Sequence, residues 1–106
     1  MRQADCPIAT ALRVISGKWK ALILRELQSK SVRYGQLKRK IPEVSQRMLT
    51  LQLRQLERDG LLKRTLQCES VIRTQYELTA YGRTLLPALE ALSRWGTRHK
   101  SRRANP

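Results

Sequence analysis

Apolar residues recur every three or four positions along most of this chain, which is the spacing of an amphipathic α-helix. The first helix is predicted to begin at Cys6–Pro7, because the fixed φ of proline suits the first helical position. A second helix is predicted after Ser16–Gly17, and a short third helix begins near Tyr34. The apolar positions that define these helices are Ile8, Ala11, Leu12 and Ile15, then Trp19, Leu22, Ile23 and Leu27, and finally Tyr34, Leu37 and Ile41.

A fourth helix is predicted after a turn at 41–44, because the residue before Pro42 is pushed away from helical angles. Ser45 can cap this helix, which runs to about Asp59 and stops at Gly60. A wheel at about 100° per residue gives the helix two faces. The core face holds Leu49, Leu53 and Leu56, and the opposite stripe holds Arg47, Thr50, Leu51, Arg54 and Arg58.

The C-terminal half is predicted to form a hairpin and one last helix. Residues 61–68 and 73–79 read as two short strands, since apolar and polar residues alternate in the second of them. The last helix is expected over 79–96 as one continuous element, with an apolar face that covers about half of its circumference. That face holds Tyr81, Leu85, Leu86, Ala88, Leu89, Leu92 and Trp95. It is wide for packing on one side only, so we expect a second copy of the chain to share it.

The predicted order is helix, helix, short strand, helix, turn, helix, hairpin, helix. Two helices joined by a tight turn and followed by a basic hairpin form a winged helix-turn-helix. The predicted fold class is therefore mainly α with a small β-hairpin. Residues 1–97 are expected to form a single DNA-binding and dimerisation domain, and 98–106 a basic, mobile tail.

Charge narrows the possible partners. The chain has 22 Lys and Arg against 8 Asp and Glu, a net charge of +14, which attracts polyanions such as nucleic acid or an anionic membrane. A membrane-surface role needs a free apolar helix face, and here those faces are required for the core and the dimer. No membrane-spanning run or signal peptide is recognised, so a cytoplasmic protein is expected. No metal-ligand cluster, glycine loop or carboxylate pair stands out, so neither catalysis nor a cofactor is expected.

Nucleic-acid chemistry is concentrated in the fourth helix. Ser45, Gln46 and Arg47 lie at its N-terminal end, the part of a recognition helix that meets base edges. Arginine can present a fork to guanine, and glutamine can pair with adenine. The alternative interpretation is a solvated basic face. The turn, the hairpin and the net charge together favour DNA binding.

The sequence resembles the HxlR-type winged-helix regulators of bacteria and archaea, which are relatives of the MarR regulators. The motifs that carry the resemblance are "CP" at Cys6–Pro7, "GKWKALILREL" from Gly17, "RYGQLKRKIPEVSQRMLTLQLRQLERDGL" from Arg33 and "YELTAYGRTLLPAL" from Tyr76. The resemblance implies a homodimer formed through the first and last helices. It also implies DNA-contact roles for Ser45, Gln46, Arg47, Thr50 and Arg54 in the groove-reading helix, and for Arg64 and Arg73 in the wing. Lys38 faces outward from the third helix, and we expect it to contact the DNA backbone.

Two positions depart from the family pattern. Leu51 stands on the DNA-facing stripe where a polar residue is usual, and we predict that it packs against a thymine methyl. The prolines that often stiffen the family's wing are missing, and Cys68 takes the place of one of them. The wing is therefore expected either to be more flexible or to pair more fully as strand.

Cys6 is a candidate regulatory thiol. It precedes a helix in a strongly positive protein, and both features favour the thiolate. Some relatives sense oxidants or electrophiles through a cysteine at this place, although a small, inert, partly buried cysteine is the alternative. The predicted function is a sequence-specific transcriptional regulator that binds a roughly palindromic operator as a homodimer. The alternative is an architectural protein that binds double-stranded DNA through charge without reading its sequence.

Overall fold

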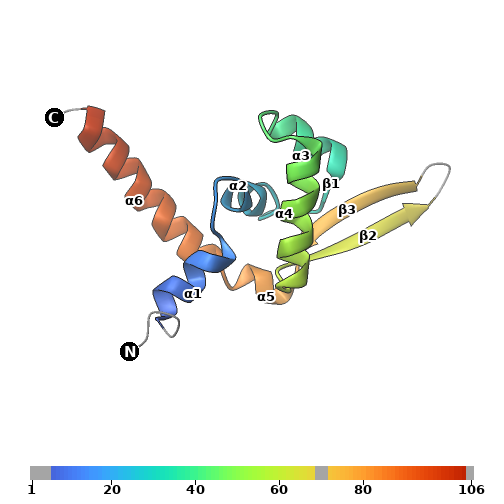
Figure 1. Cartoon of the computed structure of the whole chain (residues 1–106), viewed down its shortest axis with the longest axis horizontal. Coiled ribbons are helices and arrows are strands. Elements are labelled where there is room, and N and C mark those ends of the chain that lie inside the picture. Colours follow the sequence, from blue (N-terminus) through green and yellow to red (C-terminus); the bar gives the residue numbers. More distant parts are fainter. Residues whose placement is uncertain (1–5, 69–71, 105–106) are drawn as a thin grey trace.

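Helices and strands follow the predicted order, with differences confined to the C-terminal end (Figure 1). The computed structural model describes residues 6–68 and 72–104. The helices are α1 (Pro7–Val14), α2 (Trp19–Glu26), α3 (Tyr34–Lys40), α4 (Gln46–Arg58), α5 (Ala80–Arg83) and α6 (Leu86–Ala104). The strands are β1 (Val32–Arg33), β2 (Leu62–Cys68) and β3 (Ile72–Leu78). Within these described residues, no helix is both long and apolar enough to span a membrane.

The core is built around α4. Its leucines Leu49, Leu53 and Leu56 are at most 1% exposed, as the wheel predicted. They pack in one cluster whose other main members are Ile23 and Leu24 of α2, Leu27 at its C-cap, Leu37 of α3, and Leu62, Tyr76 and Leu78 at the base of the hairpin. Burying a leucine side chain contributes roughly 1.5–3 kcal/mol. This packing fixes the rotation of α4 about its axis, and with it the residues that face outward.

Both ends of α4 are held by the residues predicted to do so. The Ser45 hydroxyl accepts a hydrogen bond from the Met48 backbone N–H at 3.0 Å, which satisfies one of the free donors of the first turn. Gly60 follows the helix with φ of +81°, a conformation that costs glycine little. The direction and length of α4 are therefore set locally as well as by the core.

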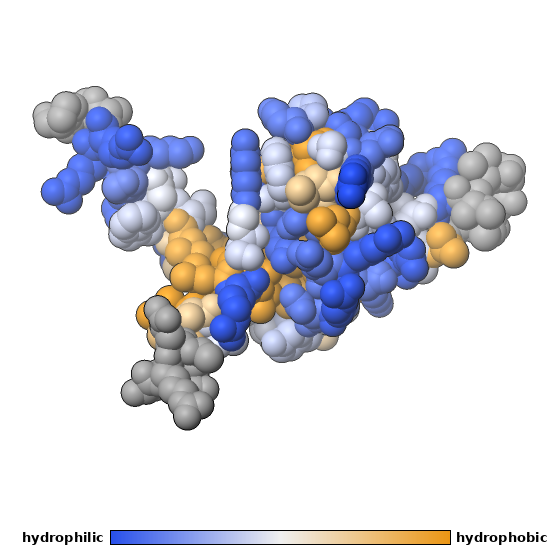
Figure 2. All heavy atoms as spheres, in the orientation of Figure 1, coloured by the Kyte–Doolittle hydropathy of each residue, from blue (hydrophilic) through white to orange (hydrophobic). Residues whose placement is uncertain are grey.

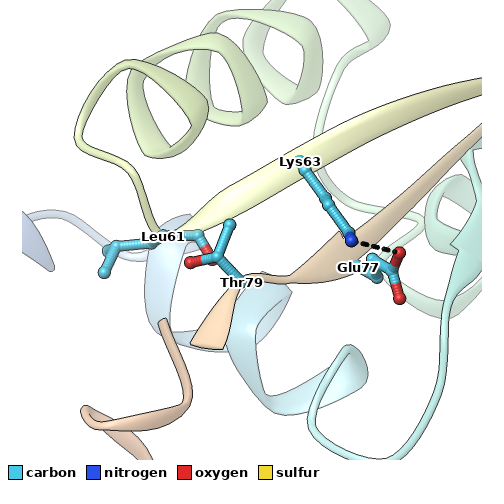
Figure 3. Close-up of polar contacts among 4 residues, drawn as sticks. All are labelled: Leu61, Lys63, Glu77 and Thr79. Carbon is cyan, nitrogen blue, oxygen red and sulfur yellow. Dashed lines mark hydrogen bonds and ion pairs between the residues drawn. The ribbon is translucent and has the colours of Figure 1, made fainter. Parts of the chain in front are cut away.

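The wing is the hairpin of β2 and β3, which belongs to a three-stranded antiparallel sheet in the order β1-β3-β2. β2 and β3 pair from Leu62↔Leu78 to Cys68↔Ile72, and the two residues of β1 pair with the base of β3. For a wing without prolines we expected either more flexibility or fuller strand pairing, and the structure shows the fuller pairing. Near the base, Lys63 Nζ lies 3.2 Å from Glu77 Oε1 across the two strands (Figure 3). The hairpin projects from the side of the domain opposite α6 (Figure 1).

The continuous last helix predicted from Thr79 is wrong. The chain forms the short α5, a turn and then α6. Pro87 explains the break, because it has no N–H to donate to the Arg83 carbonyl and its ring would clash with that carbonyl in a continuous helix. Thr79 instead caps α5, accepting a hydrogen bond from the Gly82 N–H at 2.9 Å.

The predicted boundary between domain and tail is not a break in secondary structure. α6 continues without interruption through Ala104, so residues 98–104 are helical. Basic residues in its last turn suit the negative end of the helix dipole, which helps to explain why the helix extends this far. Mobility of the segment in solution stays a prediction.

Candidate nucleic-acid interface

The outward face of α4 forms a shallow depression of about 570 Å³. It is lined by Tyr34, Gln46, Arg47, Thr50, Leu51 and Arg54. Five of these six residues are the groove-reading residues expected from the sequence, and none of the six is acidic. Ser45, the remaining expected residue, is exposed at the N-terminal end of α4, where it caps the helix.

Two arginines and one leucine stand out on this face. Arg47 and Arg54 are exposed, and neither forms an ion pair with any residue in the described part of the chain. Their guanidinium groups are therefore available to a polyanion. Leu51 is 46% exposed between these charged groups. An exposed leucine in this position can contact an apolar group on DNA, and the thymine methyl is such a group.

Tyr34 is a member of this site that the sequence analysis missed. It was expected only to face inward, and its ring does pack against the core. Its hydroxyl, however, donates to the Gln46 carbonyl at 3.1 Å and lies 3.2 Å from Thr50 Oγ1. The available signal was its chemistry, because a tyrosine with a buried ring usually finds a partner for its hydroxyl. Tyr34 thereby links the start of α3 to the first turns of α4.

The residues expected in the wing are separated by the strand register. Arg64 pairs with Tyr76 and Arg73 with Gln67, so alternation places the two arginine side chains on opposite faces of the hairpin. Arg64 Nε lies 3.8 Å from Glu57 Oε1 on α4, which offsets part of its charge. A DNA backbone that runs along one face of the hairpin therefore meets only one of these two arginines directly.

Arg73 instead belongs to a groove of about 510 Å³ between α3 and β3. Arg33 and Arg39, which were not predicted as site residues, line the same groove. Lys38 was expected to contact the DNA backbone. Its ammonium group instead donates a hydrogen bond to the Pro42 carbonyl at 3.1 Å. The basic groove is thus built by the neighbours of Lys38 rather than by Lys38 itself.

The base of the wing carries a perturbed tyrosine. Burial raises the pKa of Tyr76 above its ordinary value of 10.0, and the positive charge of Arg64 acts in the opposite direction.

Further along β2, Leu66 is 60% exposed on the same face as Arg64. The sequence analysis did not single out Leu66, although an exposed apolar side chain on a wing has the chemistry to insert between base steps.

Cys6 lies apart from these groups. It is half-buried at the N-cap position of α1, and this helix lies on the far side of the domain from the wing (Figure 1). The structure does not bring it together with the α4 face. The side chain of Cys68 lies outside the described part of the structure.

A second surface is apolar and lies on α1, α5 and α6. Among the described residues, seven large hydrophobic side chains are exposed, and five of them are on these three helices. We call this set the apolar face: Ile8, Leu12, Tyr81, Leu92 and Trp95. Figure 2 shows apolar atoms gathered where α1 meets α6. The remaining two, Leu51 and Leu66, lie on α4 and the wing.

Comparisons with known proteins agree with this architecture. Residues 14–104 match the family model described as HxlR-like helix-turn-helix. The chain is 41% identical over 97 residues to the HTH-type transcriptional regulator YdeP of Bacillus subtilis, covering 92% of this chain and 76% of YdeP.

Two solved structures have the same fold as this chain. A regulator of the MarR family from Porphyromonas gingivalis superimposes with a TM-score of 0.85 at 33% identity, covering 92% of this chain and 95% of that one. The redox regulator HypR in its reduced form superimposes with a TM-score of 0.85 at 37% identity, covering 90% and 94%. The chain therefore belongs to the HxlR-like helix-turn-helix family of DNA-binding transcriptional regulators, which are not enzymes.

Proposed function

We propose that this protein is a homodimeric regulator that reads a roughly palindromic operator with α4. The observation that carries this proposal is the depression on α4, where a glutamine, a threonine, a leucine and two arginines with no ion-pair partner among residues 6–68 and 72–104 share one surface whose lining has no acidic residue. Arginine and glutamine can distinguish guanine and adenine in the major groove, and leucine can recognise thymine through its methyl group. Non-specific attraction to DNA requires only positive charge, so it does not account for the glutamine and the leucine on this surface.

The apolar face supports the homodimer. Exposed apolar patches rimmed by polar residues commonly mark protein–protein interfaces, and a second copy with the same patch satisfies it symmetrically. Ile8 and Leu12 come from α1, while Leu92 and Trp95 come from α6. Two copies joined in this way would present two α4 helices to successive major grooves about one turn, or a multiple of one turn, apart.

The decisive experiment is a binding selection from a random duplex library at near-physiological salt, followed by sequencing. We expect an inverted repeat whose half-sites are separated by whole helical turns. A matched pair of variants sharpens the test: Arg47→Gln changes the reading face, and Lys30→Gln removes one exposed positive charge outside it. Arg47→Gln should change the selected motif, whereas Lys30→Gln should leave it unchanged. Enrichment of no motif by the wild type would support the architectural alternative and contradict this proposal.

We also propose that oxidation of Cys6 regulates DNA binding. Cys6 is partly accessible at the start of α1, beside the apolar face, so a change at its sulfur can alter how two copies pack. The similarity to HypR, described as a redox regulator, supports a redox function. A disulfide-forming oxidant applied with a small thiol joins the Cys6 sulfur to the sulfur of that thiol, and the oxidant takes up the two thiol hydrogens. We expect this mixed disulfide to change the operator affinity of the wild type and of Cys68→Ser, but not of Cys6→Ser. A Cys6→Ser protein that responds as the wild type does would refute the role of Cys6.

A further inference from the structure

The C-terminal half of α6 carries a concentration of positive charge that the winged helix does not explain. After Glu90 the sequence contains no Asp or Glu, while Arg94, Arg98, Lys100, Arg102 and Arg103 all follow. Each of these five side chains is exposed, and none forms an ion pair with another described residue. Leu89 is the last residue of α6 that packs against the core. The helix therefore continues well beyond its own domain (Figure 1).

The spacing of three arginines is unfavourable for an isolated helix. Arg94, Arg98 and Arg102 follow one another at i, i+4 and i+8, so they form one stripe along α6. Like charges four residues apart destabilise a helix by a few tenths of a kcal/mol for each pair. The favourable dipole at the C-terminus acts only within the last turn, so it does not offset the charge of Arg94. A bound polyanion would remove this repulsion.

We propose that the stripe of Arg94, Arg98 and Arg102, which we call the α6 arginine stripe, is a second DNA-binding surface that contacts the phosphate backbone of a duplex. Successive members of the stripe rise by about 6 Å along the helix, so the stripe spans about 12 Å. One DNA strand presents a phosphate about every 3.4 Å along the duplex axis, so several phosphates lie within that span. Exposed arginines bind phosphate well, and such contacts add affinity without reading sequence.

A membrane surface fits this segment less well. An amphipathic helix at a bilayer needs an apolar face along its length. Beyond Trp95, however, the segment to Arg103 contains only Gly, Thr, Arg, His, Lys and Ser. Trp95 stacks on His99 at a ring-centroid distance of 5.0 Å, but this pair supplies one aromatic contact rather than a continuous apolar face. Duplex DNA is the polyanion that the family already binds.

This inference rests on the proposed DNA-binding function, and its test separates the two. The operator affinity of Arg98→Gln/Arg102→Gln is measured over a range of salt concentrations on two duplexes, one of about two helical turns and one of about four. The matched control Lys18→Gln/Lys30→Gln also removes two exposed positive charges. A second variant, Arg98→Lys/Arg102→Lys, keeps the charge, and circular dichroism and sedimentation check that each variant folds and dimerises.

We expect the slope of log Kobs against log salt on the long duplex to become shallower by about 0.9 for each phosphate that is no longer neutralised, or about 1.8 per chain. The charge-retaining variant should keep the wild-type slope, and the control pair should change it by much less. The selected base preference should stay the same in all variants. These results would support the proposal.

An unchanged slope in Arg98→Gln/Arg102→Gln, or an equal change in the control pair, would overturn the proposal while leaving the operator-binding function intact. The DNA assignment would also be overturned if the stripe variant lost binding to vesicles of anionic phospholipid but kept its DNA slope. Failure of the wild type to bind either duplex would instead show that the proposed function itself is wrong.

Discussion

The packing of α5 against the start of β2 makes a quantitative prediction for Gly82→Ala. Gly82 is buried, and a Cβ added to it would lie 2.1 Å from the Leu61 carbonyl oxygen and 3.0 Å from the carbonyl carbon. Both are backbone atoms, so no side-chain rotation can relieve the overlap. The Leu61 carbonyl is also held in place, because the Thr79 N–H donates to it at 3.0 Å. Leu61 and Thr79 lie side by side in Figure 3.

The cost of Gly82→Ala follows from the movement that the overlap requires. To bring the added Cβ to an ordinary van der Waals distance from the Leu61 carbonyl oxygen, α5 must move away by about 1 Å. This movement stretches the hydrogen bonds that Thr79 makes on either side of the contact. The Thr79 hydroxyl donates to the Gly60 carbonyl at 2.6 Å and accepts from the Gly82 N–H at 2.9 Å. Losing two such bonds costs about 2 kcal/mol, and overpacking adds about 1–3 kcal/mol. The total is about 3–5 kcal/mol, a large fraction of the roughly 5–15 kcal/mol that stabilises a domain.

Urea unfolding followed by circular dichroism measures this destabilisation, with all variants at one protein concentration because the proposed dimerisation would couple to stability. Gly35→Ala is the matched control, since this glycine is also helical and a Cβ there would meet only Arg39 Nη1, at 3.7 Å. Replacing a helical glycine without a clash should stabilise by about 0.5–1 kcal/mol. If Gly82→Ala cost less than about 1 kcal/mol, the reasoning that this close backbone approach requires glycine would be refuted.

Three further predictions concern side chains at the site and the wing. Tyr34→Phe should destabilise by about 1 kcal/mol in urea unfolding and change the base preference at one operator position, because it removes the hydroxyl that contacts Gln46 and Thr50; an unchanged preference would limit Tyr34 to a structural role. Leu51→Gln should shift base preference at one position without loss of the fold, measured by the same duplex selection, and identical motifs would contradict the thymine contact. Because burial raises the pKa of Tyr76, the unfolded state loses this proton first, so stability falls as the pH rises above about 10. Tyr76→Phe should flatten that fall in unfolding measured between neutral and alkaline pH, and an equal fall in both proteins would disprove the assignment.

Much of the candidate site on α4 was predictable because it depends on one helix with a strong apolar pattern. Three leucines fix which side of α4 is buried, and the side left over contains the residues that the sequence analysis chose. Ser45 and Gly60 define the ends of the same helix through local chemistry. These signals act over a few residues, so they can be read without knowledge of the tertiary structure.

The residues that were missed depend on contacts between distant segments. Tyr34 reaches Gln46 and Thr50 across the helix-turn-helix, and the sequence does not specify that distance. The split between Arg64 and Arg73 depends on strand register, because a shift of one residue reverses the face of every side chain. The break between α5 and α6 was predictable in principle. Pro87 indicates it, but the apolar spacing across the break is the same as in one continuous helix.

The net charge of +14 is not evenly offset over the molecule, because among the described residues the ion pairs with acidic residues lie in only a few places. In the described part of the chain, the ion pairs join Arg25 to Glu26, Lys63 to Glu77 and Arg64 to Glu57. None of them involves the α4 depression or the α6 arginine stripe. The few carboxylates therefore offset positive charge on α2 and the base of the wing, while Arg47 and Arg54 keep theirs. In the proposed function, a polyanion attracted by the charge of Arg47 and Arg54 meets the other side chains of the α4 depression on the same surface, which is an arrangement that couples non-specific attraction to sequence recognition.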